Sequence, residues 1–194
     1  MVIAIEGLPG SGKTTSARLL AARLGVPAVL ETTHDHPFLS TVYDDAERYD
    51  LEVELAFLLL HHAAYRRLNR SHTVVLDFSP VKDLLFAEAM LSGKDRAVFE
   101  ALYEHVYAPF APPDLVVYLD ASPELSFQRV MTRLETEPDR RFEAEMDIDR
   151  LRLMCQLYDA RLAELGREVV RLEVTGSQDP DYVADALARL APNI

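Results

Sequence analysis

The stretch Gly7-Leu8-Pro9-Gly10-Ser11-Gly12-Lys13-Thr14 decides the fold of this chain. It fits the pattern G-x-x-x-x-G-K-[ST] at every fixed position, and this pattern is typical of loops that hold nucleotide phosphates. Apolar residues 2–5 predict a strand before it, and residues 15–24 predict a helix after it. Glycines let backbone N–H groups converge on an anion, and the N-terminus of the following helix adds a favourable dipole.

The motif also assigns roles to its polar members. Lys13 would reach the β- and γ-phosphates, and the Thr14 hydroxyl would bind Mg²⁺. The alternative is a glycine-rich turn without a ligand, which the four filled positions and the flanking elements disfavour. We therefore predict a nucleotide-binding protein, whose nucleotide contacts come from Gly7, Gly10, Ser11, Gly12, Lys13, Thr14 and Thr15.

Composition narrows the class of protein. The chain has 194 residues, of which 49% are hydrophobic and 27% charged, enough for one substantial core. A formal charge of −12 argues against nucleic acid or an anionic membrane as the main partner. The single cysteine, Cys155, excludes an internal disulfide and a thiolate metal cluster. The first strand begins at residue 2 and no apolar run is long enough to span a membrane, so we expect a cytoplasmic protein.

Strand and helix patterns alternate along the chain. Strands are expected at residues 2–5, 26–30, 73–77, 115–120 and 168–174, and helices at 15–24, 46–69, 81–91, 95–107, from 122 onward, 147–165 and 179–190. The Arg- and Glu-rich residues 133–143 are expected to form a mobile loop. Strands that are apolar throughout indicate a parallel sheet covered on both faces. We therefore predict one α/β domain over residues 1–194, a P-loop NTPase three-layer sandwich with a five-stranded sheet and a lid loop.

Three predicted strands end in an acidic residue. In open parallel sheets, ligands bind beyond the carboxyl ends of the strands, so Glu31, Asp77 and Asp120 are the acids to weigh. Pattern alone does not rank Asp120 below Asp77. The resemblance described next favours Asp77 as the acid of the site, so we expect Asp120 to be a loop or cap residue.

Four stretches together resemble the deoxynucleoside kinases, particularly the bacterial deoxyadenosine/deoxyguanosine-type enzymes. They cover nearly the whole chain. The stretches are Ile5-Glu6-Gly7 with the phosphate loop; residues 31–60, with Glu31, Pro37-Phe38-Leu39, Tyr43, Arg48 and Phe57-Leu58 at family spacing; Asp77 to Asp83 with Phe86-Ala87; and Phe142-Glu143 followed by Asp147 and Leu151. The resemblance implies ATP- and Mg²⁺-dependent phosphorylation of the 5′-hydroxyl of a (deoxy)nucleoside, and a homodimer formed through long helices.

The resemblance also implies roles for individual residues. Glu31 matches the carboxylate that accepts the proton of the attacking 5′-hydroxyl, and Asp77 matches the acid that works with Mg²⁺. Tyr43 and Glu143 match groups that hydrogen-bond the sugar 3′-hydroxyl. Arg129 and Arg133, four residues apart on one helix face, match arginines that clamp the transferring phosphate. Arg140 or Arg141 would be a third such arginine.

Each of these roles has a structural alternative. Arg129 and Arg133 could be a solvated helix face, Glu31 could merely end a strand, and Tyr43 could be a core residue with a wet hydroxyl.

The sequence departs from the family across the acceptor side. The arginine that usually follows the acid matched by Asp77 is replaced by Phe78, and the one that usually follows Asp83 is replaced by Leu84. Lys82 could supply the lost charge. In the family, a glutamine and an arginine bind the nucleobase together with the acid that Asp83 matches. In this chain those two positions are Glu54 and His61.

Spacings of 3 and 7 place Glu54, Phe57 and His61 on one helix face, where they would line a base pocket with Asp83. An ionised glutamate only accepts hydrogen bonds, so we expect a purine with a guanine-like edge of adjacent donors.

Two other functions compete with nucleoside phosphorylation. A nucleoside monophosphate kinase resembling thymidylate kinase would need basic residues around a dianionic acceptor, whereas residues 31–54 are rich in acids. The other is a non-catalytic, regulatory nucleotide-binding protein that kept its phosphate loop after losing the two arginines.

Overall fold

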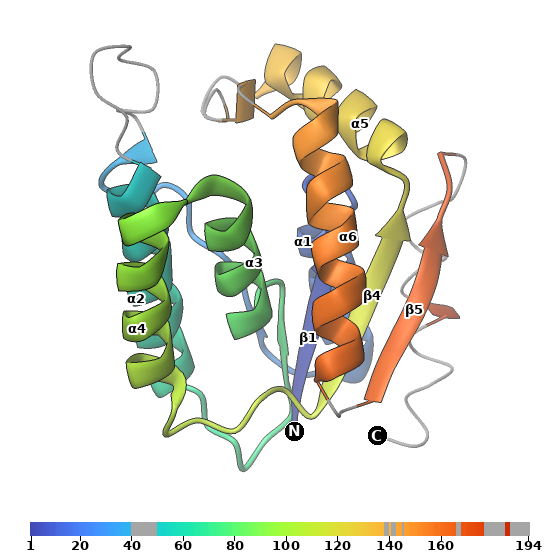
Figure 1. The fold of residues 1–194 in the computed structure, drawn as a ribbon. Helices are drawn as coiled ribbons and strands as arrows, with labels where there is room; N and C mark the ends of the chain where they lie inside the picture. Colours follow the sequence, from blue (N-terminus) through green and yellow to red (C-terminus); the bar gives the residue numbers. More distant parts are fainter. Residues whose placement is uncertain are drawn as a thin grey trace.

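The computed structural model describes residues 1–39, 50–137, 140, 143–144, 146–165, 168–176 and 185–186 (Figure 1). Strands and helices alternate in the order β1 (Val2–Gly7), α1 (Lys13–Leu24), β2 (Ala28–Val29), α2 (Asp50–Arg66), β3 (Val74–Leu76), α3 (Pro80–Met90), α4 (Gly93–Tyr107), β4 (Leu115–Ala121), α5 (Pro123–Thr136), α6 (Ile148–Glu164) and β5 (Glu168–Val174).

These strands form one parallel five-stranded sheet with the order β2-β3-β1-β4-β5. Side chains of β1 alternate between two cores. Ile3 and Ile5 pack against α1 on one face, and Val2 packs toward α2 and α4 on the other face. Helices α3 and α6 cover the remaining part of that second face, and α6 crosses in front of β1 and β4 in Figure 1. The predicted α/β architecture is confirmed.

The first strand lies in the middle of the sheet, between β3 and β4. Chain crossovers leave this point in opposite directions, which opens a crevice beyond the carboxyl end of β1. The phosphate-loop motif begins at the last residue of β1, Gly7, so it lies at this crevice.

Two details differ from the sequence-based expectation. Helix α5 continues to Thr136, so the segment that begins at Arg133 starts as helix rather than loop. The reason is that Leu134 packs into the core with α6, and this packing stabilises another helical turn. Asp120 lies inside β4 and not in a loop; it is half exposed, 3.8 Å from Arg171 on β5. The expected closing helix, 179–190, falls almost wholly outside the described residues.

A buried carboxyl, Glu6, joins three elements behind the phosphate loop. Its Oε1 accepts a hydrogen bond of 2.5 Å from Ser79 Oγ, and its Oε2 accepts one of 2.9 Å from Tyr158 Oη on α6. Burial raises the pKa of Glu6 to about 7. Ser79 is also the N-cap of α3, where its oxygen accepts from Val81 N and Pro80 takes the first position. Glu6 thus fixes the start of α3, which carries several residues of the site.

Within the described part of the chain, no helix is long and apolar enough to cross a membrane.

Candidate active site

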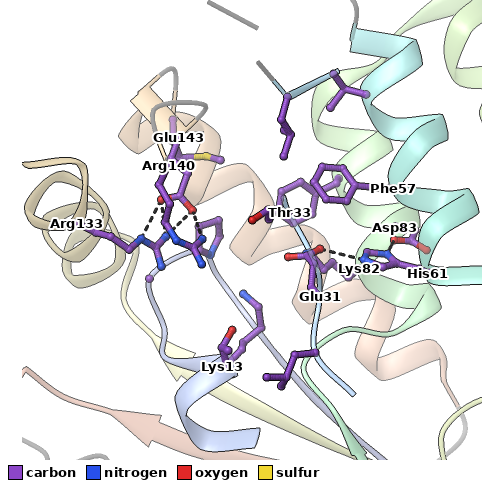
Figure 2. A pocket seen from close by; sticks show the side chains of 18 of the residues that line it. Lys13, Glu31, Thr33, Phe57, His61, Lys82, Asp83, Arg133, Arg140 and Glu143 are labelled. Carbon is purple, nitrogen blue, oxygen red and sulfur yellow. Dashed lines mark hydrogen bonds and ion pairs between the residues drawn. The ribbon is translucent and has the colours of Figure 1, made fainter. Parts of the chain in front are cut away.

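A cavity of about 530 Å³ opens beyond the carboxyl ends of β1 and β2. Its floor is the phosphate loop, and its walls come from the segment after β2, from α2 and α3, and from the residues between α5 and α6. Figure 2 shows two groups of side chains facing each other across it, with Lys13 between them. Arg133, Arg140 and Glu143 form one group; Glu31, His61, Lys82 and Asp83 form the other.

The phosphate loop has the shape that its glycines were expected to allow. At Gly10 the φ angle is +79°, and an added Cβ would lie 2.7 Å from the Ser126 carbonyl oxygen of α5. At Gly12, the N-cap of α1, φ is +100° and the space beside the backbone is open. Both positions need glycine, the first for close approach and the second for conformation. This open cradle at a helix N-terminus suits a phosphate group.

The side chain of Lys13 folds back onto the backbone of its own loop. Its Nζ donates to the carbonyl oxygens of Gly7 (2.8 Å) and Leu8 (3.0 Å). Burial, followed by the nearby Lys82 charge, lowers the pKa of Lys13 to about 8. A phosphate in the loop would give this ammonium the negative partner that its burial calls for.

Thr14 and Asp77 come together at the start of α1 and the end of β3. The Thr14 hydroxyl donates to Asp77 Oδ2 at 2.6 Å, and the backbone N–H of Glu31 donates to Asp77 Oδ1 at 2.6 Å. Among the described residues, no group of three or more His, Cys, Asp or Glu side chains gathers to hold a metal alone. One hydroxyl and one carboxylate suit Mg²⁺, which takes most of its remaining ligands from phosphates and water.

Glu31 is held between two cationic side chains. Lys82 Nζ from α3 donates to Glu31 Oε1, and His61 Nε2 from α2 lies 3.0 Å from the same oxygen. Glu31 therefore does more than end a strand: the three elements β2, α2 and α3 converge on its carboxylate. Lys82 supplies charge here, as expected of a stand-in for the missing arginines.

His61 also reaches Asp83, and through it α4. Its Nδ1 lies 2.5 Å from Asp83 Oδ1, while Tyr107 Oη donates to Asp83 Oδ2 at 2.7 Å. The His61 ring stacks on Phe78 with ring centroids 4.2 Å apart and planes 15° apart. Both oxygens of Asp83 are thus engaged by protein groups. The structure places His61 and Asp83 at the cavity wall, as expected, but pairs them with each other rather than leaving both free for a base.

Burial and neighbouring charges act in opposite directions on the protonation of the cluster formed by Glu31, His61, Lys82 and Asp83. Burial acts to raise the pKa of Glu31, but Lys82 and then His61 outweigh it and hold that pKa well below its usual range. Burial acts to lower the pKa of His61, but Asp83 and Glu31 raise it to about 9. Near neutral pH the cluster therefore contains an ionised Glu31 and a cationic His61.

The raised pKa of His61 predicts an alkaline loss of stability. A histidine whose pKa is about 9 when folded and 6.5 in the reference state stabilises the fold fully below pH 6.5 and loses this contribution as the pH rises through 9. The loss amounts to about 3 kcal/mol. We expect the unfolding free energy of wild type to exceed that of His61→Gln at pH 6, and the gap to narrow by about this amount at pH 10. Urea titrations across this range measure it.

A control for this prediction lies on the same helix. His62 has a lowered pKa because of partial burial and Arg66, so the gap between wild type and His62→Gln should not narrow above pH 7. A gap for His61→Gln that is constant from pH 6 to 10 would contradict a cationic His61.

Glu54 and Phe57 line the cavity together with His61, so the predicted helix face is confirmed. Glu54 is only 5% exposed. Burial and then the Asp83 charge raise the pKa of Glu54 to about 8. The carboxyl is therefore mostly neutral at pH 7, which removes the premise of an ionised, accept-only group behind the expected guanine-like edge.

On the opposite side, two arginines converge on Glu143. Arg133 donates to it from Nε to Oε2 at 3.0 Å and from Nη2 to both Oε1 and Oε2 at 2.5 Å, and Arg140 Nη1 donates to Oε1 at 3.3 Å. Arg129 points elsewhere: it bonds the carbonyl oxygens of Gly10 (3.4 Å) and Thr175 (3.5 Å), outside the main cavity. Of the predicted arginines, Arg133 and the third candidate Arg140 line the cavity, and Arg129 does not. Arg141 and Tyr43 fall outside the described residues.

Several residues of the site were absent from the sequence-based set, three of them polar groups of note. Arg18 lines the cavity from α1, and its position one turn after Thr14 was a usable signal. Thr33 lines it from the loop after β2. Tyr107 holds Asp83 from the end of α4, and no sequence pattern links residues so far apart.

Comparison with known proteins agrees with this geometry. A family model described as deoxynucleoside kinase matches residues 3–186. The chain is 28% identical to deoxyguanosine kinase of Bacillus subtilis, over 93% of this chain and 88% of that protein, and 26% identical to deoxyadenosine kinase of Dictyostelium discoideum, over 95% and 77%. The solved structure of M. mycoides deoxyadenosine kinase with the products dCMP and dCDP has the same fold, with a TM-score of 0.83, 18% identity and full coverage of both chains.

The predicted kinase activity is confirmed at the level of the family, and the two competing functions are not favoured. A phosphate-binding loop, a carboxylate across the cavity from it and a match over nearly all of the sequence lead to one conclusion: this chain belongs to the deoxynucleoside kinase family.

Proposed function

We propose that the protein transfers the γ-phosphoryl group of ATP to the 5′-hydroxyl of a deoxynucleoside, with Glu31 as the general base. The observation that carries this assignment is the position of Glu31, an ionised carboxylate that lines the same cavity as Lys13 and Thr14. A sugar hydroxyl is a weak nucleophile, so a base within hydrogen-bond reach is what the reaction requires.

In this mechanism the 5′-oxygen forms a bond to the γ-phosphorus while the bond from that phosphorus to the β–γ bridging oxygen breaks. ADP leaves, and the proton of the hydroxyl passes to Glu31 Oε2, because Oε1 is already shared by Lys82 and His61. Catalysis rests mainly on positioning and electrostatics, because the transferring group is loosely bonded in the transition state.

The donor side supplies the positive charge that the phosphates need. Lys13 would turn from the loop carbonyls to the β- and γ-phosphates. Thr14 and Asp77 would hold Mg²⁺, which would neutralise part of the phosphate charge. Arg133 and Arg140 line the other side of the cavity, where their guanidinium groups would contact the transferring phosphoryl group.

Before that contact, both arginines share the carboxylate of Glu143. A phosphoryl group that binds Arg133 competes with Glu143, which would free this carboxylate to accept a hydrogen bond from the sugar 3′-hydroxyl. Arg129 would act indirectly, because its contact with the Gly10 carbonyl supports the phosphate loop.

Transfer of labelled phosphate tests the proposal. The protein is incubated with [γ-³²P]ATP, Mg²⁺ and single nucleosides or nucleoside monophosphates, and the products are separated by chromatography. We expect labelled nucleoside 5′-monophosphate. Label in nucleoside diphosphates alone would support the monophosphate kinase. Nucleotide binding without transfer to any acceptor would support the non-catalytic protein.

The acceptor side of the cavity favours a neutral acceptor over a monophosphate. Lys82 is committed to Glu31, and Asp50 and Asp83 lie on the same side. These carboxylates would repel the dianionic phosphate of a nucleoside monophosphate.

The homodimer and the cytoplasmic location stay predictions. Light scattering coupled to gel filtration would give the mass of the assembly, to be compared with the 21.9 kDa of one chain.

A further inference from the structure

Among the described residues, the carboxyl of Glu54 differs from the other carboxyls of the cavity because no hydrogen bond or ion pair reaches it. Glu54 is 5% exposed and lines the cavity from α2. The carboxylates of Glu31, Asp77, Asp83 and Glu143 are each bonded. The oxygens of Glu54 are not among the fully enclosed unpaired atoms of the described residues, so they open onto the cavity, where a ligand can bond them.

Aromatic and apolar side chains share the cavity wall with Glu54. Phe57 lies one turn further along α2, and Phe86 and Met90 line the cavity from α3. The Lys82 ammonium lies 5.6 Å from the Phe57 ring and 5.2 Å from the Phe86 ring. Such walls suit a planar ring, whose orientation is fixed by the polar groups among them. The two apolar residues Leu39 and Val53 complete the lining near this end.

The position of Glu54 along α2 matches that of the nucleobase, the end of a nucleoside opposite its 5′-hydroxyl. Glu54 precedes His61 by two turns, about 10 Å along the helix axis. His61 contacts Glu31, where the 5′-hydroxyl would lie. A sugar and a base bridge the span between these two points, so the base edge would meet Glu54.

The charges that shift the pKa of Glu54 are mainly negative, since Asp83, Asp50 and Glu31 raise it and Lys82 lowers it. Burial comes first and the Asp83 carboxylate second in raising its pKa to about 8. The charged groups that face Glu54 are Glu31 from the end of β2, Asp50 and His61 from its own helix, Lys82 and Asp83 from α3, and Arg133, Arg140, Glu143 and Arg150 from across the cavity.

We propose that Glu54 reads the nucleobase as a neutral carboxylic acid and selects a base edge with an acceptor beside a donor, as in adenine and cytosine. A neutral carboxyl donates one hydrogen bond and accepts another, which matches N1 and the 6-amino group of adenine, or N3 and the 4-amino group of cytosine. Guanine presents two adjacent donors, N1–H and the 2-amino group, and needs the ionised form. This inference rests on the proposed function and reverses the guanine-like expectation.

The two protonation states make the preference depend on pH. Near a pKa of 8, the ratio of ionised to neutral Glu54 rises tenfold with each pH unit. The ratio of kcat/KM for deoxyguanosine to that for deoxyadenosine should rise by the same factor. We expect deoxyadenosine to be preferred at pH 6.5, and the ratio to rise on the order of 100-fold between pH 6.5 and 8.5.

Competition between the two nucleosides in one reaction measures this ratio. Both substrates use the same Lys13, Glu31 and Asp77, so the pH dependence of the catalytic groups cancels. Glu54→Gln keeps one donor and one acceptor at every pH, so it should retain the preference for deoxyadenosine with a flat ratio. Glu52→Gln, an exposed change on the same helix, should keep the wild-type pH dependence.

The outcomes separate this inference from the proposed function. Absence of transfer to any nucleoside defeats the proposed function. Transfer with a flat ratio in wild type, or with a deoxyguanosine preference at pH 6.5, overturns the role of Glu54 alone. A ratio that still rises with pH in Glu54→Gln assigns the titration to another group and overturns it as well. Because the wild-type ratio is itself decisive, the test stands even if Glu54→Gln does not fold.

Discussion

Replacement of Glu31 by glutamine is expected to abolish phosphoryl transfer, with kcat lowered by about 10²- to 10⁴-fold. Glutamine has nearly the same shape but accepts no proton from the attacking hydroxyl. The backbone N–H of residue 31 still donates to Asp77, and Lys13 and Thr14 are untouched, so ATP affinity should change less than about threefold. Initial rates with saturating nucleoside give kcat, and a fluorescent ATP analogue gives the dissociation constant.

The matched control is the other acid near a strand end, Asp120. It lies within β4, half exposed, and faces Arg171 rather than the cavity. Asp120→Asn should therefore leave both kcat and ATP affinity unchanged. A Glu31→Gln enzyme with more than a tenth of the wild-type turnover would refute the role of Glu31 as the base.

The donor side of the site was predictable because its information is local. Gly7 to Thr14 contains the turn, the lysine and the hydroxyl in eight consecutive residues, and the flanking strand and helix follow from hydrophobic periodicity. Asp77 is separated in sequence, but the rule that ligands bind at the carboxyl ends of parallel strands placed it beside Thr14.

The acceptor side was only partly predictable because it depends on packing between distant elements. Phe78 and His61 each looked like a separate loss of a family residue. The structure shows that these two departures belong together, since the Phe78 ring supports the His61 ring against Glu31 and Asp83. No pattern within α2 or α3 encodes that contact, and Tyr107 enters from α4.

Protonation was the least predictable property. Sequence alone treats Glu54 as an ordinary ionised glutamate, whereas burial and the neighbouring Asp83 raise its pKa. The orientation of the arginines was equally hard to predict. Arg129 and Arg133 have the spacing of one helix face, yet Arg133 lines the cavity and Arg129 does not.

Replacement of Lys82 by methionine is the second change with a large expected effect. Methionine fills most of the same volume but leaves the Glu31 carboxylate with His61 as its remaining cation. We expect kcat to fall on the order of 10²-fold, because Glu31 loses the group that orients it, and the unfolding free energy to fall by about 3 kcal/mol. Lys82→Arg keeps the charge and should recover a large part of both losses.

A double-mutant cycle decides whether the effect of Lys82 acts through Glu31. Glu31→Gln alone leaves a buried ammonium without its partner, and Lys82→Met alone leaves a carboxylate in the same position, whereas the double variant buries neither charge. Breaking a buried pair costs more than removing it whole, so the double variant should be more stable than the sum of the single losses predicts, by about 2 kcal/mol. Urea titrations of all four proteins at pH 7 give this coupling energy. Additive losses would mean that Lys82 does not stabilise Glu31, and its effect on kcat would then arise from direct contact with the substrate.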